Sequence, residues 1–179
     1  MDYSQKQIQF GAISTSEREI KDILKAWIAI SAAFAIVLST SISSSELYVK
    51  FIVASLTVGV GFLLHELGHK VVAQKYGCFA EFRSFDAMLL LAVLMSFFGF
   101  VFAAPGAVMI SGRVTKSKNG IISAAGPIVN FVLALIFLSL AFFQLPGIFQ
   151  QIAFYGFMIN SWLGLFNLIP VGFLTATKY

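Results

Sequence analysis

The sequence predicts an all-α polytopic membrane protein with about five transmembrane helices, and three observations support this fold class. Of the 179 residues, 59% are hydrophobic and 11% are charged, whereas about a quarter of a soluble globular domain is charged. The charged residues lie in short segments between long uncharged runs. One such run, between Lys118 and Lys178, is long enough to cross a bilayer twice. We expect a polar N-terminal segment over residues 1–22 and a single membrane-embedded domain over residues 23–179.

The first two predicted spans lie in the first half of the chain. Ser16-Glu17-Arg18-Glu19 has the S-x-x-E form of a capping box, so a helix is expected to begin there and to enter the membrane. The uncharged run Ala26 to Ser45 can cross a bilayer core of about 30 Å. A short loop, Ser43 to Lys50, is expected after it. The second span begins at Phe51 and is expected to end at Tyr76-Gly77, where glycine can adopt the left-handed cap.

A third apolar run follows a short charged segment. Residues 78–86 are expected to connect the second span to the third. Ala87 to Ala104 is the third predicted span, and Pro105-Gly106 interrupts it because proline cannot continue a helix. Ala107 to Ile110 is too short for another helix and is predicted to be extended. A short membrane-associated β segment is therefore expected after the third span.

The remaining sequence contains the fourth and fifth predicted spans. The basic stretch Arg113 to Lys118 and the turn dipeptide Asn119-Gly120 are expected to form a loop before them. Gln144-Leu145-Pro146-Gly147 then divides the uncharged run into two helices, Ile121 to Phe143 and Ile148 to about Ile169.

The distribution of Lys and Arg predicts the orientation in the membrane. With five spans, one side collects Lys6, Arg18, Lys21, Lys25, Lys70, Lys75 and Arg83, and the other collects Lys50, Arg113, Lys116, Lys118 and Lys178. Cytoplasmic loops carry the excess of basic residues, so we expect a multi-pass protein of the cell membrane with a cytoplasmic N-terminus. The formal charge of +4 does not indicate nucleic-acid binding, because the sequence has no basic stripe and no nucleic-acid-binding motif.

The segment Gly61 to Lys70, within the second span, contains both histidines of the chain in an H-E-x-x-H motif. His65 and His69 are four residues apart, so on a helix their side chains share one face and can bind a single metal ion. Glu66 follows the first histidine and is suited to act as general base toward a water molecule on that metal. Ionisable residues are costly inside a membrane helix and are usually functional there. The motif predicts a metal-dependent hydrolytic site.

Small and polar residues elsewhere are further candidates for the site. Gly61 and Gly68 flank the histidines and either admit another backbone close to the metal or pack a neighbouring helix. Asn130 lies in the fourth span, and Asn160 and Asn167 lie on one face of the fifth. A buried asparagine in lipid either links helices or binds the backbone of a peptide substrate. Both roles stay open for Asn130 and for Asn167, and substrate binding is less favoured for Asn160.

Three motifs occur in order along the chain. They are His65-Glu66-Leu67-Gly68-His69, Ala125-Gly126-Pro127-Ile128-Val129-Asn130 and Asn167-Leu168-Ile169-Pro170. Together they resemble the site-2 protease family of intramembrane zinc metalloproteases, in particular its compact archaeal and bacterial members. The resemblance implies one Zn²⁺ per chain with His65 and His69 as ligands, Glu66 as catalytic base, and a transmembrane protein as substrate. It also implies that Asn130 and Asn167 line the substrate path.

The end of the third motif departs from the family pattern. The family continues from N-x-x-P into Leu-Asp-Gly, whose Asp is the third zinc ligand, whereas Thr175 stands at that position here. A catalytic zinc site uses three protein ligands and a water molecule, and a threonine hydroxyl is not a usual zinc ligand. Glu81 and Asp86 follow the metal helix and are the carboxylates that could substitute. The other interpretation of these two residues is interfacial charges that pair with Arg83 or are solvated.

The sequence therefore predicts an intramembrane zinc metalloendopeptidase that cleaves peptide bonds within or next to transmembrane segments of membrane proteins. The alternative is a catalytically inactive relative that binds transmembrane helices, which Thr175 favours. A membrane protease with a cytosolic catalytic domain needs an acidic ligand on a later helix and a sizeable soluble region, and the sequence shows neither. A transporter needs paired broken helices in repeated halves, and the sequence shows a single such break, at Pro105-Gly106.

Overall fold

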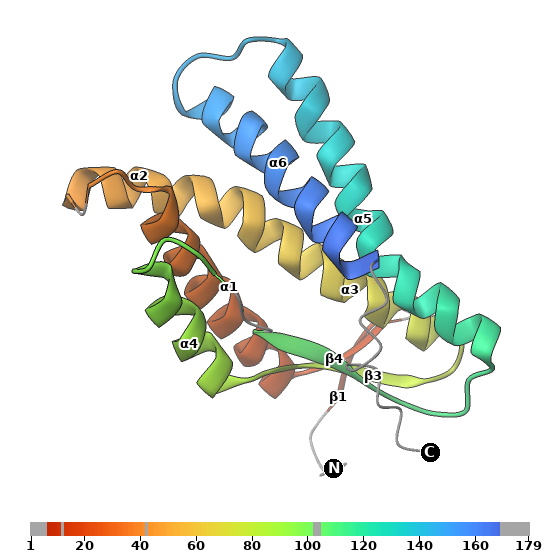
Figure 1. Ribbon diagram of the computed structural model, residues 1–179. Coiled ribbons are helices and arrows are strands. Elements are labelled where there is room, and N and C mark those ends of the chain that lie inside the picture. The colour runs from red at the N-terminus through yellow and green to blue at the C-terminus, as the bar shows by residue number, and fades with distance from the viewer. Residues whose placement is uncertain (1–6, 12, 42, 102–104, 169–179) are drawn as a thin grey trace.

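The computed structural model describes residues 7–11, 13–41, 43–101 and 105–168. In chain order these form β1 (Gln7–Phe10), β2 (Ile13–Ser16), α1 (Glu17–Leu38), α2 (Ser44–Ala54), the π-helix η1 (Ser55–Gly59), α3 (Val60–Lys75), β3 (Phe79–Ser84), α4 (Asp86–Ser96), β4 (Gly106–Ser111), α5 (Lys116–Phe142) and α6 (Ile148–Leu168). The described chain is mostly helical, as predicted. Because α2, η1 and α3 follow one another without a break, they form one long helix that crosses the molecule (Figure 1).

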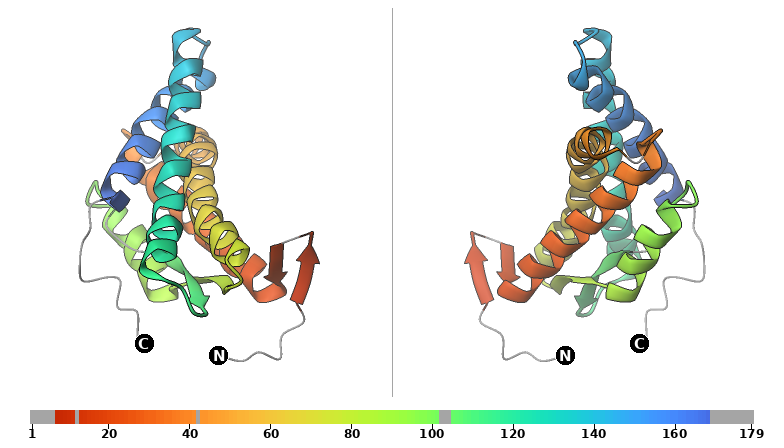
Figure 2. Two further views of the ribbon diagram at one scale, coloured as in Figure 1. Left: turned by 90° about the vertical axis from the view of Figure 1, so that its right-hand side faces the viewer. Right: turned by 90° about the vertical axis from the view of Figure 1, so that its left-hand side faces the viewer.

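The first long helix, α1, begins where the capping box predicts. Ser16 is its N-cap residue, and the Ser16 hydroxyl oxygen accepts a hydrogen bond from Glu19 N at 3.1 Å. Glu19 is fully buried, and its carboxylate binds Lys70 Nζ at 2.6 Å, which ties the start of α1 to the end of α3. The polar segment before α1 contains an antiparallel hairpin, β1–β2, which stands beside the helices (Figure 2).

The loop predicted over Ser43 to Lys50 is wrong, because α2 begins within it. The Ser43 hydroxyl oxygen accepts from Glu46 N at 3.4 Å. The Glu46 carboxylate in turn accepts from the backbone N–H groups of Thr40 and Ser41. Ser43-x-x-Glu46 is thus a second S-x-x-E cap, which starts the helix about two turns before Phe51.

The π-helix η1 interrupts the long helix shortly before the histidines. Trp27 of α1 donates from Nε1 to the Ser55 carbonyl at 3.1 Å. A Cβ on Gly59 would lie 2.6 Å from the same Trp27 nitrogen, so glycine permits this close approach. A π turn contains more residues than an α turn and therefore rotates α3 about its axis relative to α2.

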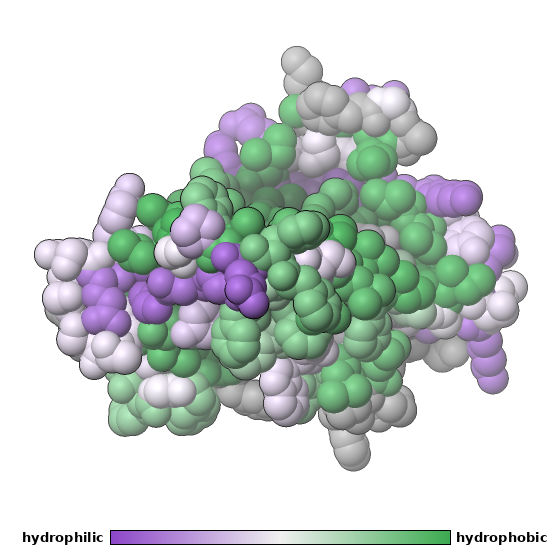
Figure 3. All heavy atoms as spheres, turned by 90° about the horizontal axis from the view of Figure 1, so that it is seen from above, coloured by the Kyte–Doolittle hydropathy of each residue, from purple (hydrophilic) through white to green (hydrophobic). Residues whose placement is uncertain are grey.

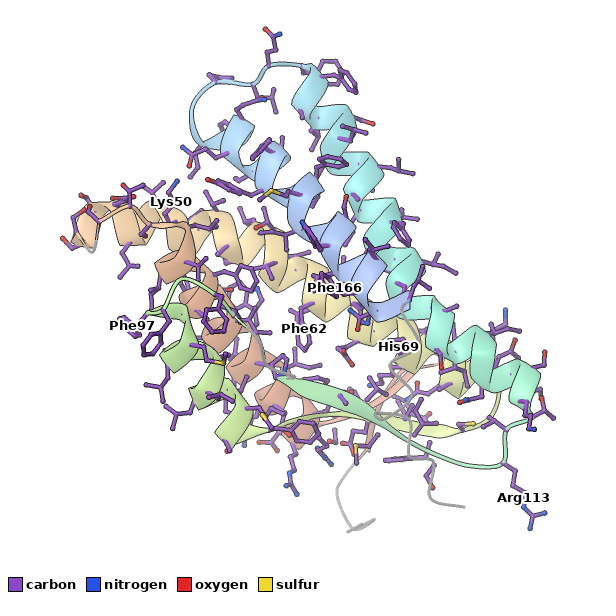
Figure 4. The ribbon with its side chains drawn as sticks, viewed as in Figure 1. Lys50, Phe62, His69, Phe97, Arg113 and Phe166 are labelled. Atoms are coloured by element: carbon purple, nitrogen blue, oxygen red, sulfur yellow. The ribbon has the colours of Figure 1, made fainter. Side chains whose placement is uncertain are left out.

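A two-stranded antiparallel sheet, β3–β4, lies across the end of α3. The extended segment predicted at Ala107 to Ile110 is confirmed, and residues 78–86, expected only as a connection, supply its partner strand. Phe82 of β3 pairs with Val108 of β4 and is almost fully buried. Phe62 points from α3 toward the sheet and meets the Phe82 ring edge-on, with centroids 5.8 Å apart (Figure 4). This aromatic contact fixes the sheet against the metal-motif helix.

The third predicted span, Ala87 to Ala104, is wrong in length. Helix α4 has 11 residues, and about 20 are needed to cross a bilayer. At the end of α4 the Ser96 hydroxyl donates to the Val93 carbonyl at 2.6 Å. Gly99 then adopts a φ of 85°, a left-handed conformation that ends the helical path. The predicted break at Pro105-Gly106 therefore comes too late: the helix already ends at Ser96 and the chain reverses at Gly99.

Helices α5 and α6 form an antiparallel pair, and α5 packs against α3 (Figures 1 and 2). The turn predicted at Asn119-Gly120 is wrong, because both residues lie inside α5. The Thr115 side chain caps this helix by accepting from Lys118 N at 3.3 Å, and helix continuation outweighs the local turn preference. The connection between α5 and α6 occurs where predicted, with positive φ at Gln144 and Gly147.

Two helices in the described ranges are long and apolar enough to cross a membrane. They are the continuous helix Ser44–Lys75 and the helix Lys116–Phe142, each of which contains a strongly apolar stretch of 18 residues. Large apolar side chains are exposed on these and other helices. Apolar residues accordingly dominate much of the face in Figure 3. Exposed apolar surface of this extent marks a contact with a membrane or with another protein.

The short α4 changes the predicted distribution of basic residues. Because β4 returns beside β3, the chain enters α5 at the end of the molecule that contains Tyr76, and Lys118 Nζ lies 5.1 Å from the Tyr76 ring centroid. The basic segment that begins at Arg113 was predicted at the end opposite Tyr76. In the structure it lies at the same end as Tyr76. Lys50 lies at the far end, where its ammonium donates to Gln151 at 2.8 Å (Figure 4).

Candidate metal centre

The two histidines project from the same face of α3 toward α5. Their Nε2 atoms are 3.0 Å apart, and the ring planes are inclined at 82°. His65 is buried, and His69 is partly buried. Figure 4 shows His69 near the end of α3, between α5 and the sheet. The four-residue spacing thus brings the two imidazoles together, as a helix requires.

Hydrogen bonds to the other ring nitrogens define what each Nε2 presents. His69 Nδ1 is 2.7 Å from the Ile122 carbonyl oxygen, which can only accept, so Nδ1 carries the hydrogen. His65 Nδ1 is 2.5 Å from Asn130 Oδ1, which likewise only accepts. Both Nε2 atoms are therefore unprotonated in the neutral rings, and their lone pairs face each other. Two acceptors cannot bond to each other, but a shared cation satisfies both.

Gly126 of α5 leaves the space in front of the two imidazoles open. A Cβ at this position would lie 2.4 Å from His69 Nε2 and 2.6 Å from His65 Nε2. A tetrahedral zinc ion with Zn–N bonds of about 2.0–2.1 Å holds two nitrogen ligands roughly 3.3 Å apart. The observed separation of 3.0 Å requires only a small opening of the rings. The donor atoms, their tautomers and the glycine therefore fit zinc.

Glu66 leaves α3 on a different side from the histidines and faces β4. Its Oε2 accepts a hydrogen bond from Val108 N at 3.2 Å. Because this N–H donates to Glu66 and not to β3, it points toward the free edge of β4. The carboxylate consequently lies at the junction of α3 and β4, beside the backbone of an extended strand.

Asn130 lies beside His65, whose Nδ1 its Oδ1 contacts. Its side chain is fully buried. Nδ2 donates to the Gly61 carbonyl at 3.2 Å and to Asn160 Oδ1 at 2.9 Å, while Oδ1 accepts from His65. Both polar atoms of the amide thus have partners inside the protein. Asn130 therefore orients a histidine.

The other predicted residues lie apart from this cluster. Asn167 is exposed on α6, and its amide donates to Leu163 on the same helix at 2.8 Å. Asp86 binds Lys25 Nζ at 2.5 Å, and this hydrogen bond holds the pKa of the Asp86 carboxyl below its usual value. The Glu81 carboxylate binds Arg83 at 2.6 Å. Neither acid replaces the third ligand, so the interpretation of both as paired charges is the correct one.

A third zinc ligand does not occur in the part of the chain that the structure describes. No group of three His, Cys, Asp or Glu side chains there is arranged to hold a metal ion. Thr175, the position of the third ligand in the resemblance, lies outside the described residues. The described centre thus consists of two imidazole ligands and a neighbouring carboxylate.

Two contributors to the centre are absent from the candidate residues: Gly126 provides the open space, and the Ile122 carbonyl sets the His69 tautomer. A third, Asn160, is a candidate whose contact with Asn130 the sequence does not predict. The Ala-Gly-Pro motif around Gly126 was the one available signal. A backbone carbonyl has no signature in sequence, and the partner of a buried asparagine depends on how helices far apart in the chain pack.

The arrangement on α3 and α5 defines a candidate metal-dependent hydrolase centre of the H-E-x-x-H class. Comparison with known proteins agrees: the chain is 39% identical over 159 residues to a protein of Methanocaldococcus jannaschii named "Putative zinc metalloprotease", and the match covers 87% of this chain and 80% of that protein. The chain therefore belongs to a family of zinc metalloproteases.

A second protein of the same organism, named "Zinc metalloprotease", is 29% identical over 136 residues. That match covers 75% of this chain but 34% of the relative, so the chain spans about a third of the longer protein. No protein-family model matches the sequence. No solved structure matches it either.

Proposed function

We propose that this protein is an intramembrane zinc metalloendopeptidase of the site-2 protease type, which hydrolyses peptide bonds within or next to transmembrane segments of membrane proteins. One observation carries the proposal. Two imidazole lone pairs converge, with a carboxylate one residue away, on a helix that is long and apolar enough to cross a membrane. A buried site of this kind is costly in lipid unless it has a function.

In this function His65 and His69 hold one Zn²⁺ through their Nε2 atoms. When bound, the zinc ion supplies Lewis-acid polarisation of the scissile carbonyl and activation of water. The hydrogen bonds from Nδ1 to Asn130 and to Ile122 keep each ring in the tautomer that ligates. Gly126 keeps the space before the rings free of side-chain atoms.

Glu66 is the general base. It takes a proton from the attacking water and delivers it to the nitrogen of the leaving amine, so that the peptide bond breaks without releasing a charged amide anion. The hydrogen bond from Val108 N restrains the carboxylate to the side of α3 that faces β4. Proton transfer therefore takes place beside the strand.

The free edge of β4 supports a role in substrate binding. A transmembrane helix must unwind before its backbone can be attacked, and the unwound segment needs new hydrogen-bond partners in a place that excludes water. Gly106 and Ile110 alternate with Val108 and present their backbone groups on the same edge as Val108. We propose that the unwound substrate pairs with this edge as an added strand. Asn167, exposed at the end of α6, is proposed to contact the same substrate.

The distribution of charge supports a multi-pass protein of the cell membrane with a cytoplasmic N-terminus. Apart from Lys50, the described Lys and Arg residues gather at the end of the molecule that contains Glu19 and Tyr76. The positive-inside rule assigns such an end to the cytoplasm. The metal centre lies toward this end of α3, so cleavage is proposed near the cytoplasmic face.

A specific observation also favours the second candidate, a catalytically inactive relative that binds transmembrane helices. The described residues provide two protein ligands, and Thr175 occupies the position of the third in the resemblance. Two ligands hold zinc more weakly than the three of an ordinary catalytic site. An inactive relative would still bind transmembrane helices at the free edge of β4, but it would not hydrolyse a peptide bond.

The deciding experiment compares wild-type protein with Glu66→Gln in zinc-loaded proteoliposomes that contain a single-span helix with a labile, glycine-containing segment. The proposal predicts cleavage by the wild type and a reduction of about 10²- to 10⁴-fold in Glu66→Gln, the usual contribution of a general base. Cleavage that is equal in both would contradict the role of Glu66. A wild type that crosslinks to the helix but never cuts it would favour the inactive relative.

A further inference from the structure

We propose that Asn160 is a positioning residue of the metal centre. It acts through Asn130 to keep the ring hydrogen of His65 on Nδ1, so that Nε2 can bind the metal. The proposal rests on the zinc function above and adds to it a residue on α6, a helix that contributes no metal ligand. The hydrogen bonds are all donated toward α6: His65 Nδ1 of α3 donates to Asn130 of α5, and Asn130 Nδ2 donates to Asn160 Oδ1. Because its hydrogen is on Nδ1, His65 keeps the Nε2 lone pair free for zinc.

The direction of each bond is fixed by chemistry. Asn160 Nδ2 donates to the Gly156 carbonyl at 2.9 Å, so Asn160 Oδ1 faces Asn130. That oxygen accepts from Asn130 Nδ2 at 2.9 Å, which turns Asn130 Oδ1 toward His65. A carbonyl oxygen facing His65 Nδ1 requires the hydrogen to be on Nδ1. His65 Nε2 is then free to ligate.

The contact between the two asparagines is closely packed. Both side chains are fully buried, where a lost hydrogen bond is not replaced by water. Gly61 of α3 makes room for it, because a Cβ at this position would lie 2.4 Å from Asn160 Oδ1. The Gly61 carbonyl also accepts from Asn130 Nδ2, at the longer distance of 3.2 Å. Asn160 therefore supplies the shorter of the two bonds that orient the Asn130 amide.

Replacement of Asn160 by Leu removes this acceptor at similar volume. One Asn130 N–H is then buried without a partner, and the preference of the amide for its present orientation weakens. In the flipped orientation Nδ2 faces His65, which moves the ring hydrogen to Nε2 and blocks ligation. Loss of a partner behind a histidine ligand typically costs 10- to 100-fold in metal affinity, so we expect a loss of roughly tenfold or more in Asn160→Leu.

The test uses ¹⁵N-histidine-labelled, zinc-free protein at about pH 8, where free imidazole is neutral. The chain has 2 histidines, so the spectrum contains two rings, which the His69→Gln variant assigns. Wild type is expected to show the hydrogen on Nδ1 of His65. Asn160→Leu is expected to shift His65 toward the Nε2–H form, with His69 unchanged, and to weaken zinc binding in a chelator competition. Asn160→Asp keeps an acceptor oxygen and should restore both properties.

Matched variants separate positioning from stability. Ser161→Ala removes a hydroxyl that bonds within α6, to Phe157, and should change neither readout. Gly61→Ala displaces Asn160 Oδ1 from the other side and should reproduce the His65 shift even if Asn160→Leu does not fold. An Nδ1–H form of His65 that persists in both variants, with wild-type zinc affinity, would overturn the proposal. Absence of proteolysis alongside the expected spectra would contradict the proposed function and leave the role of Asn160 supported.

Discussion

Nε2 of His65 lies 3.0 Å from Nε2 of His69, although neither nitrogen can donate to the other. When both imidazole rings are neutral, the two Nε2 lone pairs repel each other. It is maintained because Asn130 and the Ile122 carbonyl take both Nδ1 hydrogens, and because α5 packs closely against α3. A shared cation turns the repulsion into two ligand bonds.

The first prediction concerns the space in front of the rings. Gly126→Ala places a methyl group within 2.6 Å of both Nε2 atoms, where the ion would sit. We expect zinc affinity to fall at least as far as it does on loss of a supporting hydrogen bond, about 10- to 100-fold, as measured by competition with a chelator. Gly120→Ala on the same helix meets no atom within 4 Å and serves as control. Equal zinc affinity in the two variants would contradict the assignment of this space to the metal.

The second prediction concerns the free edge of β4. Val108→Pro removes the N–H that binds Glu66 and leaves the ladder to β3 intact, because this N–H points away from β3. We expect a lower kcat/KM for a transmembrane substrate and unchanged zinc affinity. Val108→Ala, which keeps the N–H, should retain activity. Cleavage by Val108→Pro at the wild-type rate would remove both the edge and the Val108–Glu66 bond from the mechanism.

The parts of the site that are local in sequence could be predicted, and those that depend on packing could not. Spacing alone puts His65 and His69 on one helix face with Glu66 beside them. The position of Asn130 was identified, but its contact with His65 depends on the approach of α5 to α3. Asn160 bonds to Asn130 across two helices, and nothing local in the sequence connects it to the metal.

The errors in the fold have a common physical cause. Hydropathy marks Ala87 to Ala104 as one apolar run, but it does not reveal that α4 stops at Ser96 and that the chain reverses at Gly99. The caps at Ser43 and Thr115 extend helices into segments whose local composition favours loops. Short side-chain-to-backbone bonds thus set the helix ends, and the side of the molecule on which later segments lie follows from them.

The third prediction follows from this reversal. Gly112 lies beside Cys78, because a Cβ on Gly112 would be 3.2 Å from Cys78 Sγ. Reporters inserted after Gly77 and after Gly112 should therefore report the same side of the membrane, the cytoplasm. A reporter inserted after Gly147, between α5 and α6, should report the opposite side. Opposite sides for Gly77 and Gly112 would restore a membrane-crossing third helix and contradict the β3–β4 arrangement.

The fourth prediction concerns the buried ion pair that joins α1 to α3. Glu19 and Lys70 are both buried, with Nζ to Oε2 at 2.6 Å. Glu19→Gln leaves the ammonium without its counter-charge and should lower the free energy of unfolding by about 3–5 kcal/mol, as measured by guanidinium unfolding in mild detergent. Lys21→Met breaks the exposed pair with Glu17 and should leave the free energy of unfolding nearly unchanged, because solvent screens this pair. Similar losses in the two variants would show that the buried pair has no special importance for stability.

The most direct test of the central claim is the zinc stoichiometry at equilibrium dialysis of detergent-solubilised wild type, His65→Gln and His69→Gln. If the two imidazoles hold one ion between them, wild type binds one Zn²⁺ per chain. Each single variant then loses this site, because one nitrogen alone cannot retain the ion against a chelator. Saturable zinc binding of equal affinity in the wild type and in both variants would contradict a metal centre on α3.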